Sequence, residues 1–309
     1  MNTFYTGDVL EILSSLPSES VHCCVTSPPY FGLRDYGVSG QIGLEQTPEE
    51  YVNKLVNAFR EVKRVLRKDG TLWLNLGDSF ASVHTGGHKS EKSTVGSNRP
   101  EAQEFKQNKA RPQTYGLKEK DLIGIPWMVA FALQADGWYL RSDIIWEKPN
   151  AMPESVRDRP TRSHEYIFLL SKSKQYYYDQ DAIREPSVCK SARGGSLYND
   201  TGREEAIGMG RKRWTGERSA KPYEIGRNRR TVWSIATKPF KGAHFAVFPP
   251  DLIKPCILAG CPIGGKVLDP FGGSGTVAMV ASELGRDSIY IDLNTEYTEM
   301  AKDRASTLF

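Results

Sequence analysis

Residues 265–294, GKVLDPFGGSGTVAMVASELGRDSIYIDLN, decide the fold of this chain. The stretch reads as an apolar strand, a tight glycine-rich turn, a helix, and a second strand that ends at Asp292. Gly272, Gly273 and Gly275 allow the backbone of the turn to approach a ligand at the N-terminus of the helix. An acid at the end of the second strand is placed to accept hydrogen bonds from ribose hydroxyls. The stretch therefore predicts a cofactor site at the edge of a sheet.

Three kinds of cofactor site compete for this turn. The segment GSGTVA satisfies the loose dinucleotide pattern, so a nicotinamide or flavin site remains open. An NTPase phosphate loop fits less well, because no lysine follows Gly275 where that loop requires one. DPFGGSGT, residues 269–276, is a better match to the S-adenosylmethionine-binding turn of amino-methyltransferases. That turn holds a methionine carboxylate and an adenosine, and it needs no pyrophosphate site.

Helix and strand patterns alternate through much of the remaining chain. Residues 3–8 and 20–26 read as strands on either side of a helix. From Pro48 the apolar spacing predicts a helix that stops at Gly70, followed by the strand TLWLNLGD at 71–78. Further elements are expected at 125–137 (helix), 139–148 (strand) and 164–173 (strand). This alternation predicts βαβ units and a mostly parallel sheet covered by helices.

The segment TSPPY, from Thr26 to Tyr30, ends an apolar strand with two consecutive prolines. Prolines fix φ at about −65° and donate no backbone hydrogen bond, and each holds the preceding residue extended. The result is a rigid segment that displays two acceptors, the Ser27 hydroxyl and the Pro28 carbonyl. Two fixed acceptors would bind both hydrogens of an exocyclic amino group and localise its lone pair for in-line attack on a methyl sulfonium. Tyr30 would stack on a base that has left the duplex.

Two polar, basic stretches interrupt the alternation. Residues 82–120 predict a long mobile loop, and its charge and its place after a strand suggest that it closes over DNA. Residues 189–241 carry 13 Lys and Arg against five Asp and Glu, a net charge of +8 in a chain whose total is +4. Aromatic residues such as Trp214 and Trp233 are interleaved with these bases. That interleaving favours a nucleic-acid surface over a solvated loop, because arginine meets phosphates and base edges while aromatics stack.

Taken together, these motifs resemble the β group of DNA amino-methyltransferases. The resemblance covers nearly the whole chain and is carried by five blocks in the family's order. They are TGDVLEILSSLPSESVHCCVTSPPY, GTLWLNLGDSF, MPESVRDRPTRSHEYIFLLSKS, HFAVFPPDLIKPCILAG and DPFGGSGT. The resemblance implies a Rossmann-like α/β methyltransferase fold with a seven-stranded, mostly parallel sheet. The motif order is circularly permuted, so the first and last strands of the chain should be neighbours in the sheet.

The resemblance also implies a role for each matching residue. The catalytic positions are Ser27, Pro28, Pro29 and Tyr30. The cofactor positions are Asp8, Thr26, His244, Phe245, Phe248, Pro249, Asp269, Phe271, Gly272, Gly273, Ser274, Gly275, Thr276 and Asp292. Among them Asp8 should lie near the adenine ring and Asp292 should hold the ribose, while core packing or helix capping would also explain residues 244–249. The DNA-binding candidates are Arg211, Lys212, Arg213, Trp214, Arg227, Arg229 and Arg230. No metal ligand is expected.

The target base follows from one residue. In this family a serine at the first position of the tetrapeptide accompanies cytosine-N4 methylation, whereas aspartate or asparagine accompanies adenine-N6 methylation. Ser27 therefore favours cytosine, with adenine as the alternative, since both amino groups need the same two acceptors. Cytosine-C5 methylation is disfavoured because it needs a nucleophilic cysteine, and the Pro255–Cys256 pair lacks that family's other signatures.

Two other classes of protein fit the sequence less well. A dinucleotide-dependent oxidoreductase would use the glycine-rich turn and Asp292, but it gives no role to TSPPY or the basic insert. A non-catalytic DNA-binding protein with the same fold would be expected to carry a damaged tetrapeptide or cofactor turn, and both are intact.

The organisation of the chain follows from these assignments. Residues 1–184 are the catalytic part of a methyltransferase domain, residues 185–241 its target-recognition region, and residues 242–309 the S-adenosylmethionine-binding part of the same domain. Double-stranded DNA is the expected partner of a monomer or homodimer, with a cognate restriction endonuclease as a further candidate. The 309 residues contain five cysteines without metal-ligand spacing, and neither a membrane span nor a signal peptide is apparent. A cytoplasmic protein is therefore expected.

Overall fold

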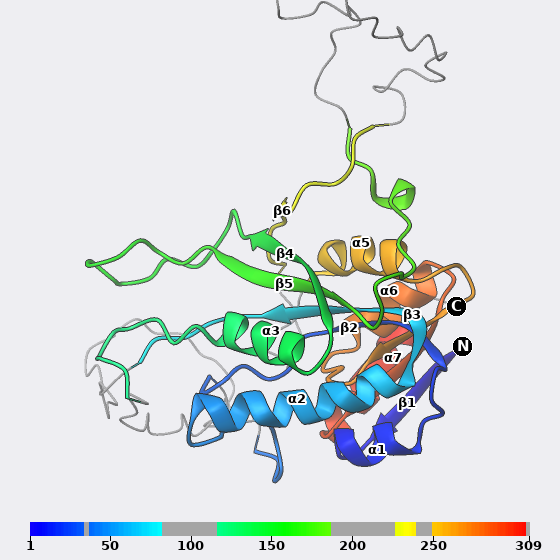
Figure 1. Cartoon of the computed structure of the whole chain (residues 1–309), viewed down its shortest axis with the longest axis horizontal. Coiled ribbons are helices and arrows are strands. Elements are labelled where there is room, and N and C mark those ends of the chain that lie inside the picture. The colour runs from blue at the N-terminus through cyan, green and yellow to red at the C-terminus, as the bar shows by residue number, and fades with distance from the viewer. Residues whose placement is uncertain (34–36, 82–115, 187–225, 239–248, 307–309) are drawn as a thin grey trace, which may run out of the picture. The chain divides into compact units, whose positions relative to one another are not determined.

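A computed structural model describes residues 1–33, 37–81, 116–186, 226–238 and 249–306 (Figure 1). Its strands are β1 (Asn2–Thr6), β2 (Val21–Thr26), β3 (Leu66–Leu76), β4 (Tyr139–Glu147), β5 (His164–Ser171), β6 (Val232–Ser234), β7 (Lys266–Asp269) and β8 (Asp287–Asp292). They form one sheet in the order β1-β8-β7-β2-β3-β5-β4-β6. Every neighbouring pair is parallel except those of β5, which runs antiparallel to β3 and β4. The expected α/β fold with a mostly parallel sheet is confirmed.

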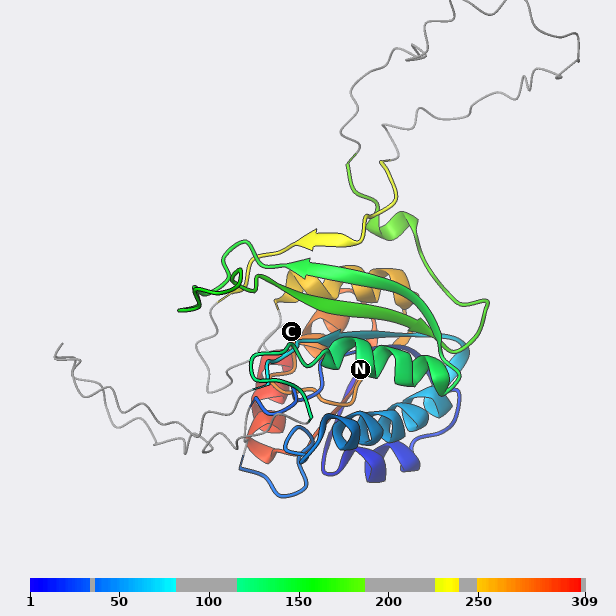
Figure 2. The ribbon, with the colours of Figure 1, turned by 60° about the vertical axis from the view of Figure 1, so that its left-hand side comes forward.

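The described sheet has one strand more than the seven predicted. The additional strand is β6, which pairs with β4 from Ile145↔Val232 to Glu147↔Ser234 and lies beyond it at the sheet edge (Figure 2). It was missed because it is only three residues long and falls in the stretch assigned to DNA recognition. Trp233 on this strand is buried and its ring packs near that of Trp73, so Trp233 is part of the hydrophobic core.

Helices cover both faces of the sheet (Figure 1). One face carries α1 (Val9–Ser15), α2 (Pro48–Val65) and α3 (Ile125–Ala135), and the other carries α5 (Pro250–Gly260) and α6 (Thr276–Glu283). The last helix, α7 (Thr295–Ser306), packs against α6. The buried face of α2 places Leu55, Phe59 and Val62 against the sheet, and each has no exposed surface. Fully burying a side chain of this size contributes about 1.5–3 kcal/mol, so α2 is a major support of the sheet.

Helix α2 ends earlier than the sequence predicts. Its last residue is Val65, and β3 begins at Leu66, so Gly70 lies within a strand instead of ending the helix. The last carbonyls of α2 are taken by residues before β2, because Glu19 N donates to Arg64 O and Ser20 N to Val65 O. The end of α2 is therefore set by these long-range hydrogen bonds and by the pairing of β3, and not by Gly70.

The two ends of the chain meet in the sheet, as the permuted motif order predicts. β1 pairs in parallel with β8 from Asn2↔Ser288 to Thr6↔Asp292. The Asn2 side chain reinforces this pairing by hydrogen bonds with Ser282 and Ser288. Strand β1 at the start of the chain therefore lies in the same sheet as β7, the strand that the glycine-rich turn follows.

The described residues fall into two compact units, Met1–Asp179 with Thr231–Phe309, and Gln180–Arg230. The smaller unit overlaps the predicted recognition region, residues 185–241, over residues 185–230, while residues 231–238 belong to the larger unit. Within the smaller unit a short 3₁₀ helix, η1 (Asp181–Ile183), precedes Glu185, which forms an antiparallel bridge with Arg227. Its recognition role stays a prediction.

No helix among the described residues is long and apolar enough to cross a membrane. The same residues contain no cluster of three or more His, Cys, Asp or Glu side chains that could hold a metal ion.

Candidate active site

Chemically important residues from separate parts of the chain meet at one edge of the sheet. This edge is formed by the carboxyl ends of the parallel strands and by the amino end of β5, as the pairs Thr6↔Asp292, Thr26↔Leu74 and Glu147↔His164 show. A cavity of about 760 Å³ opens there. In open α/β sheets, ligands bind outside the carboxyl ends of the strands, so this cavity is the candidate active site.

The tetrapeptide Ser27–Tyr30 lines the middle of the cavity. Its proline segment is held from outside by the buried Tyr51 of α2, whose hydroxyl donates to the Pro29 carbonyl at 2.8 Å. The Tyr30 ring packs on Gly77, where a Cβ atom would lie 2.5 Å from the ring, so a larger residue at that position would displace the tyrosine. The segment is therefore fixed at its proline and tyrosine positions while Ser27 faces the cavity.

A network of polar side chains surrounds the Tyr30 hydroxyl. Ser27 Oγ donates to Tyr30 Oη at 3.4 Å, and Tyr30 Oη donates to Glu165 Oε2 at 2.7 Å. The other carboxylate oxygen of Glu165 forms an ion pair with Lys148 Nζ. Asn75 Nδ2 also donates to Glu165 Oε2, at 3.3 Å. We call these five residues, Ser27, Tyr30, Asn75, Lys148 and Glu165, the Tyr30 cluster.

The environment of the Tyr30 cluster keeps its tyrosine protonated. Burial raises the pKa of Tyr30 well above its ordinary value, and the negative charge of Glu165 raises it further. The ammonium of Lys148 lies 4.3 Å from the centre of the Trp146 ring, a cation–π arrangement that fixes its position. All five members of the cluster line the cavity.

The opposite wall of the cavity carries the glycine-rich turn and the end of β8. Asp292 Oδ2 accepts from Gly273 N and its Oδ1 accepts from Asn294 N, both at 2.8 Å. Burial raises the pKa of Asp292. Although Asp292 is largely buried, it lines the cavity. Gly272 cannot carry a side chain, because a Cβ atom there would overlap the ring of Tyr290. Asp8 caps α1 by accepting from Leu10 N at 2.8 Å, and it lines the same cavity.

This wall fits a nucleoside better than a pyrophosphate. Its acidic groups, Asp8 and Asp292, would repel the phosphates of a dinucleotide, whereas a sulfonium centre and ribose hydroxyls complement them. Among its described lining residues no lysine or arginine comes from the turn itself. The donor set of the turn is therefore compatible with S-adenosylmethionine.

Thr26 and Asp269 connect the two walls from behind. Thr26 Oγ1 donates to Asp269 Oδ1 at 2.7 Å, and Phe271 N donates to the same oxygen at 3.2 Å. Both side chains are buried and do not line the cavity. Burial raises the pKa of Asp269 to about 7. In this position they join the strand that carries Ser27 to the turn that carries Phe271.

The structure brings most of the predicted site residues together. Those that line the cavity are Asp8, Ser27, Pro28, Pro29, Tyr30, Phe271, Gly272, Gly273, Ser274, Thr276 and Asp292. Four cofactor candidates lie outside its lining: Thr26, Pro249, Asp269 and Gly275. Pro249 instead precedes the first turn of α5, and Gly275 caps α6 with a φ of 76°.

Several predicted residues are not placed with the cavity. His244, Phe245, Phe248, Arg211, Lys212, Arg213 and Trp214 lie outside the described residues, as does most of the predicted loop at 82–120. Arg227, Arg229 and Arg230 belong to the smaller unit. There Arg227 and Arg230 both donate to Glu185 Oε1, at 2.8 and 2.7 Å.

Three members of the Tyr30 cluster were missed by the sequence analysis. Lys148 directly follows β4, and Asn75 is a polar residue in the apolar segment of β3, so the sequence contained an indication of both as site residues. The indication for Glu165 was weaker, because it lies at the start of its strand. It reaches the site only because β5 is antiparallel, which brings its amino end to the edge where the other strands finish.

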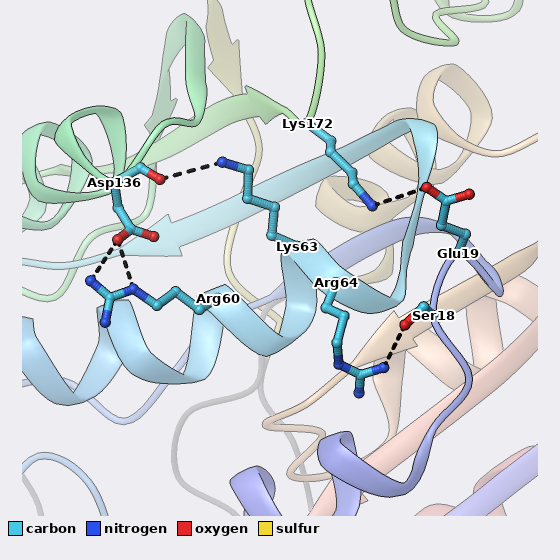
Figure 3. Close-up of a pocket in the computed structure, with 7 residues that line it drawn as sticks. All are labelled: Ser18, Glu19, Arg60, Lys63, Arg64, Asp136 and Lys172. Atoms are coloured by element: carbon cyan, nitrogen blue, oxygen red, sulfur yellow. Dashed lines mark hydrogen bonds and ion pairs between the residues drawn. The ribbon is translucent and has the colours of Figure 1, made fainter.

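A second charged pocket lies at the opposite edge of the sheet (Figure 3). It is lined by Ser18, Glu19, Arg60, Lys63, Arg64, Asp136 and Lys172. Here the cations fasten the backbone: Arg64 donates to Leu13 O and Leu16 O at the end of α1, and Lys172 Nζ donates to Leu66 O at 2.6 Å. This pocket ties helices and loops together.

Comparison with known proteins places the chain among the DNA methyltransferases. A family model described as DNA methylase, the N6/N4 type, matches residues 21–303. The Type II methyltransferase M.Cfr9I of Citrobacter freundii is 50% identical over 98% of this chain and 87% of its own length. The Type II methyltransferase M.SmaI of Serratia marcescens is 50% identical over 96% and 88%, respectively.

Solved structures share the fold at lower identity. The PvuII DNA methyltransferase, described as cytosine-N4-specific, is 19% identical with a TM-score of 0.62 and covers 98% of this chain and 86% of its own. The Thermus thermophilus protein TTHA0409, solved in complex with S-adenosyl-L-methionine, is 21% identical with a TM-score of 0.59. It covers 99% of this chain and 94% of its own.

Proposed function

Because the chain belongs to the N6/N4 family of DNA methylases, we propose that it methylates the N4 amino group of a cytosine in DNA, with S-adenosylmethionine as the methyl donor. The membership bears out the predicted resemblance and removes the oxidoreductase alternative. The finer proposal, cytosine as the target, is supported by one observation: the residue at the first position of the tetrapeptide is a serine, Ser27, and it lines the cavity together with the glycine-rich turn.

The tetrapeptide supplies the acceptors for the amino group. Ser27 Oγ donates its proton to Tyr30, so its lone pairs are available for an N–H of the target base. The Pro28 carbonyl is the second acceptor, in a segment that Tyr51 holds through the neighbouring Pro29 carbonyl. Two acceptors on a fixed backbone lower the cost of drawing the amino nitrogen towards tetrahedral geometry.

The glycine-rich wall holds the methyl donor. S-adenosylmethionine supplies an electrophilic methyl group on a sulfonium. Asp292 accepts from the ribose hydroxyls, Asp8 lies by the adenine, and the backbone from Phe271 to Thr276 surrounds the methionine part. Asp269 and Thr26 act as positioning residues, since they join this wall to the strand that presents Ser27.

The partner is double-stranded DNA whose target base is flipped into the cavity. Recognition of the surrounding sequence is assigned to residues 185–241, whose bases and aromatics suit phosphates and stacked bases. The 50% identity to Type II methyltransferases supports a role beside a cognate restriction endonuclease.

Two assays test the cofactor and the substrate class. Calorimetry with S-adenosylmethionine and with NAD should show binding of the first alone. Transfer of an isotopically labelled methyl group should then appear in duplex DNA. The proposal would be contradicted if the protein bound NAD but not S-adenosylmethionine. It would also be contradicted if no duplex DNA substrate acquired the labelled methyl group. If the labelled methyl group is found on adenine and not on cytosine, the chain is still a DNA amino-methyltransferase. The preference for cytosine that was inferred from Ser27 would then be wrong, and the adenine alternative would hold.

A further inference from the structure

The Tyr30 cluster forms a continuous path from the amino-group acceptor to a carboxylate. Its links are Ser27 Oγ to Tyr30 Oη at 3.4 Å and Tyr30 Oη to Glu165 Oε2 at 2.7 Å. The single Tyr30 hydroxyl proton has two acceptors within reach, Glu165 Oε2 at 2.7 Å and Asn75 Oδ1 at 3.1 Å. With that proton in the shorter bond, each hydroxyl donates towards Glu165, and both protons can shift by one oxygen in the same direction. The path ends at an ion pair, because the second oxygen of Glu165 contacts Lys148 Nζ.

Amino methylation, the proposed function on which this inference rests, produces a proton that must leave. When the nitrogen forms its bond to the methyl carbon, the carbon–sulfur bond breaks with its electron pair remaining on sulfur. The nitrogen then carries a positive charge until one N–H bond gives up a proton. A cavity closed around a flipped base excludes bulk water, so a built-in acceptor is an advantage.

We propose that Glu165 is the final acceptor of this proton, reached through Ser27 and Tyr30. The amino proton moves to Ser27 Oγ as the Ser27 hydroxyl proton moves to Tyr30 Oη, and the Tyr30 proton moves to Glu165 Oε2. The products are a neutral methylamino group, a serine and a tyrosine in their original forms, and a protonated Glu165. Charge and atoms balance without a further reactant.

The other acids that line the cavity are less suited to this role. Asp8 and Asp292 lie on the cofactor wall and accept from backbone N–H groups. Glu154 pairs with Arg159 and accepts from Arg162 N. Among the described residues, Glu165 is the acid with a hydrogen-bonded path to Ser27.

Lys148 and Tyr30 determine how charge is distributed along the path before and after the proton is transferred. Before reaction the Lys148 ammonium balances the Glu165 carboxylate, and the proton arriving afterwards is accepted next to this cation. The high pKa of Tyr30 means that it passes a proton on and does not keep a negative charge. The neighbouring His164 is another titratable group whose charge interacts with Glu165: burial and Arg162 lower the pKa of His164, and Glu165 raises it. Asn75, which does not titrate, donates to Glu165 Oε2.

The test compares Glu165→Gln and Tyr30→Phe with wild type in single-turnover methylation of duplex DNA. Each variant should slow the chemical step by about 10²-fold, within the range for general acid–base groups. The double variant should be no slower than the slower single variant, because both changes break the same path. Calorimetric affinities for S-adenosylmethionine and DNA should stay within about twofold of wild type.

The pH profile gives a readout that a purely structural role would not change. In wild type the single-turnover rate should fall in acid, and this fall should disappear in Glu165→Gln, which lacks the carboxylate that accepts the proton. An acid limb that persists in that variant would assign the titration to His164 and overturn the proposal. Independent, multiplying effects of the two changes would overturn it as well.

A spectroscopic control does not depend on turnover. The absorbance titration of Tyr30, isolated by subtracting Tyr30→Phe, should shift to lower pH in Glu165→Gln, because the neighbouring charge is removed. No shift would show that the carboxylate does not act on the tyrosine. Glu19→Gln is the matched variant, since Glu19 pairs with Lys172 at the far edge of the sheet, and its rate should equal that of wild type.

Failure of this proposal can be told from failure of the proposed function. Wild type that yields no methylated amino group contradicts the function itself. Wild type that is active while Glu165→Gln is equally fast contradicts the proton path alone. Methylation of adenine in place of cytosine leaves the test intact, because that amino group also loses one proton.

Discussion

The two charged pockets of this chain occupy opposite edges of one sheet and use the same kinds of residue differently. At the carboxyl edge, Lys148 and Glu165 pair with each other, and Glu165 continues through Tyr30 to Ser27. At the amino edge, Lys172 and Arg64 donate to backbone carbonyls of neighbouring elements. Figure 3 shows further bonds of this pocket, from Arg60 and Lys63 of α2 to Asp136, from Arg64 to Ser18 and from Lys172 to Glu19.

The two pockets differ in what their polar groups can do. The cations of the second pocket bond main-chain carbonyls and single side chains of neighbouring elements, which fixes the positions of those elements. The first pocket instead contains a connected series of two hydroxyls and a carboxylate beside a cavity, through which a proton can pass. The predicted consequences are loss of rate at the first pocket and loss of stability at the second.

The largest effect is expected from Ser27→Ala. It removes a proposed acceptor of the amino group while the fixed prolines and the Tyr30 ring remain. Loss of one preorganised hydrogen-bonding group at a reacting centre typically costs about 10²–10³ in rate. Single-turnover rates should fall by that factor, while calorimetric affinity for S-adenosylmethionine stays nearly unchanged. Undiminished turnover would remove Ser27 from the chemistry.

A matched pair of lysine variants compares the pockets directly. Lys148→Met leaves the Glu165 carboxylate without its cation, and the single-turnover rate should fall by about tenfold or more. Lys172→Met removes a donor to Leu66 O and should leave the rate within about twofold of wild type. Its cost should instead be about 1 kcal/mol of unfolding free energy, measured by urea denaturation. Equal effects on rate would erase the distinction between the two pockets.

The pH dependence of stability should be concentrated at the carboxyl edge. The pKa of Asp269 is raised by burial to about 7, from an ordinary 3.8. The folded state therefore holds this proton more tightly than the unfolded state. The associated stability is fully present below about pH 4 and is lost as the pH rises through about 7.

Asp269→Asn should remove this contribution while keeping an acceptor for Thr26 and Phe271. The difference between wild-type and variant unfolding free energies should change with pH by an amount on the order of 4 kcal/mol between pH 4 and 8. A constant difference across that range would mean that Asp269 does not carry a raised pKa in the folded state.

The smallest effect on rate is expected from Arg64→Ala in the amino-edge pocket. The change frees the Leu13 and Leu16 carbonyls at the end of α1 and removes the bond to Ser18. A partly buried network of this kind should contribute about 1–2 kcal/mol to unfolding free energy. Chemical denaturation measures the loss, and methylation rates at a temperature where the variant is folded should match wild type. A strong loss of rate would link this pocket to catalysis.

Much of the fold could be predicted because the deciding signals are local. The glycine-rich turn, the helical spacing of α2 and the proline stop after β2 each depend on neighbouring residues. The pairing of β1 with β8 followed from the permuted motif order. The end of α2 and the existence of β6 could not be predicted, since both depend on hydrogen bonds to distant segments.

The candidate site divides in the same way. The tetrapeptide and the turn are contiguous motifs, and the cavity contains most of their residues. Lys148 follows β4 and Glu165 lies on β5, and the two meet only because β5 runs antiparallel to β4. Asp269 and Thr26 were assigned to the cofactor from their motifs, but their burial behind the cavity depends on how β2 and β7 pack.

The role of Ser27 can be tested by mass spectrometry of nucleosides from duplex DNA treated with the enzyme and S-adenosylmethionine. Wild type should yield N4-methylcytosine, and Ser27→Ala should yield nearly none at equal cofactor binding. A product methylated at adenine N6 would contradict the assignment of cytosine. A product methylated at carbon 5 of cytosine, or equal yields from both proteins, would contradict the central claim that Ser27 presents an amino group for methylation.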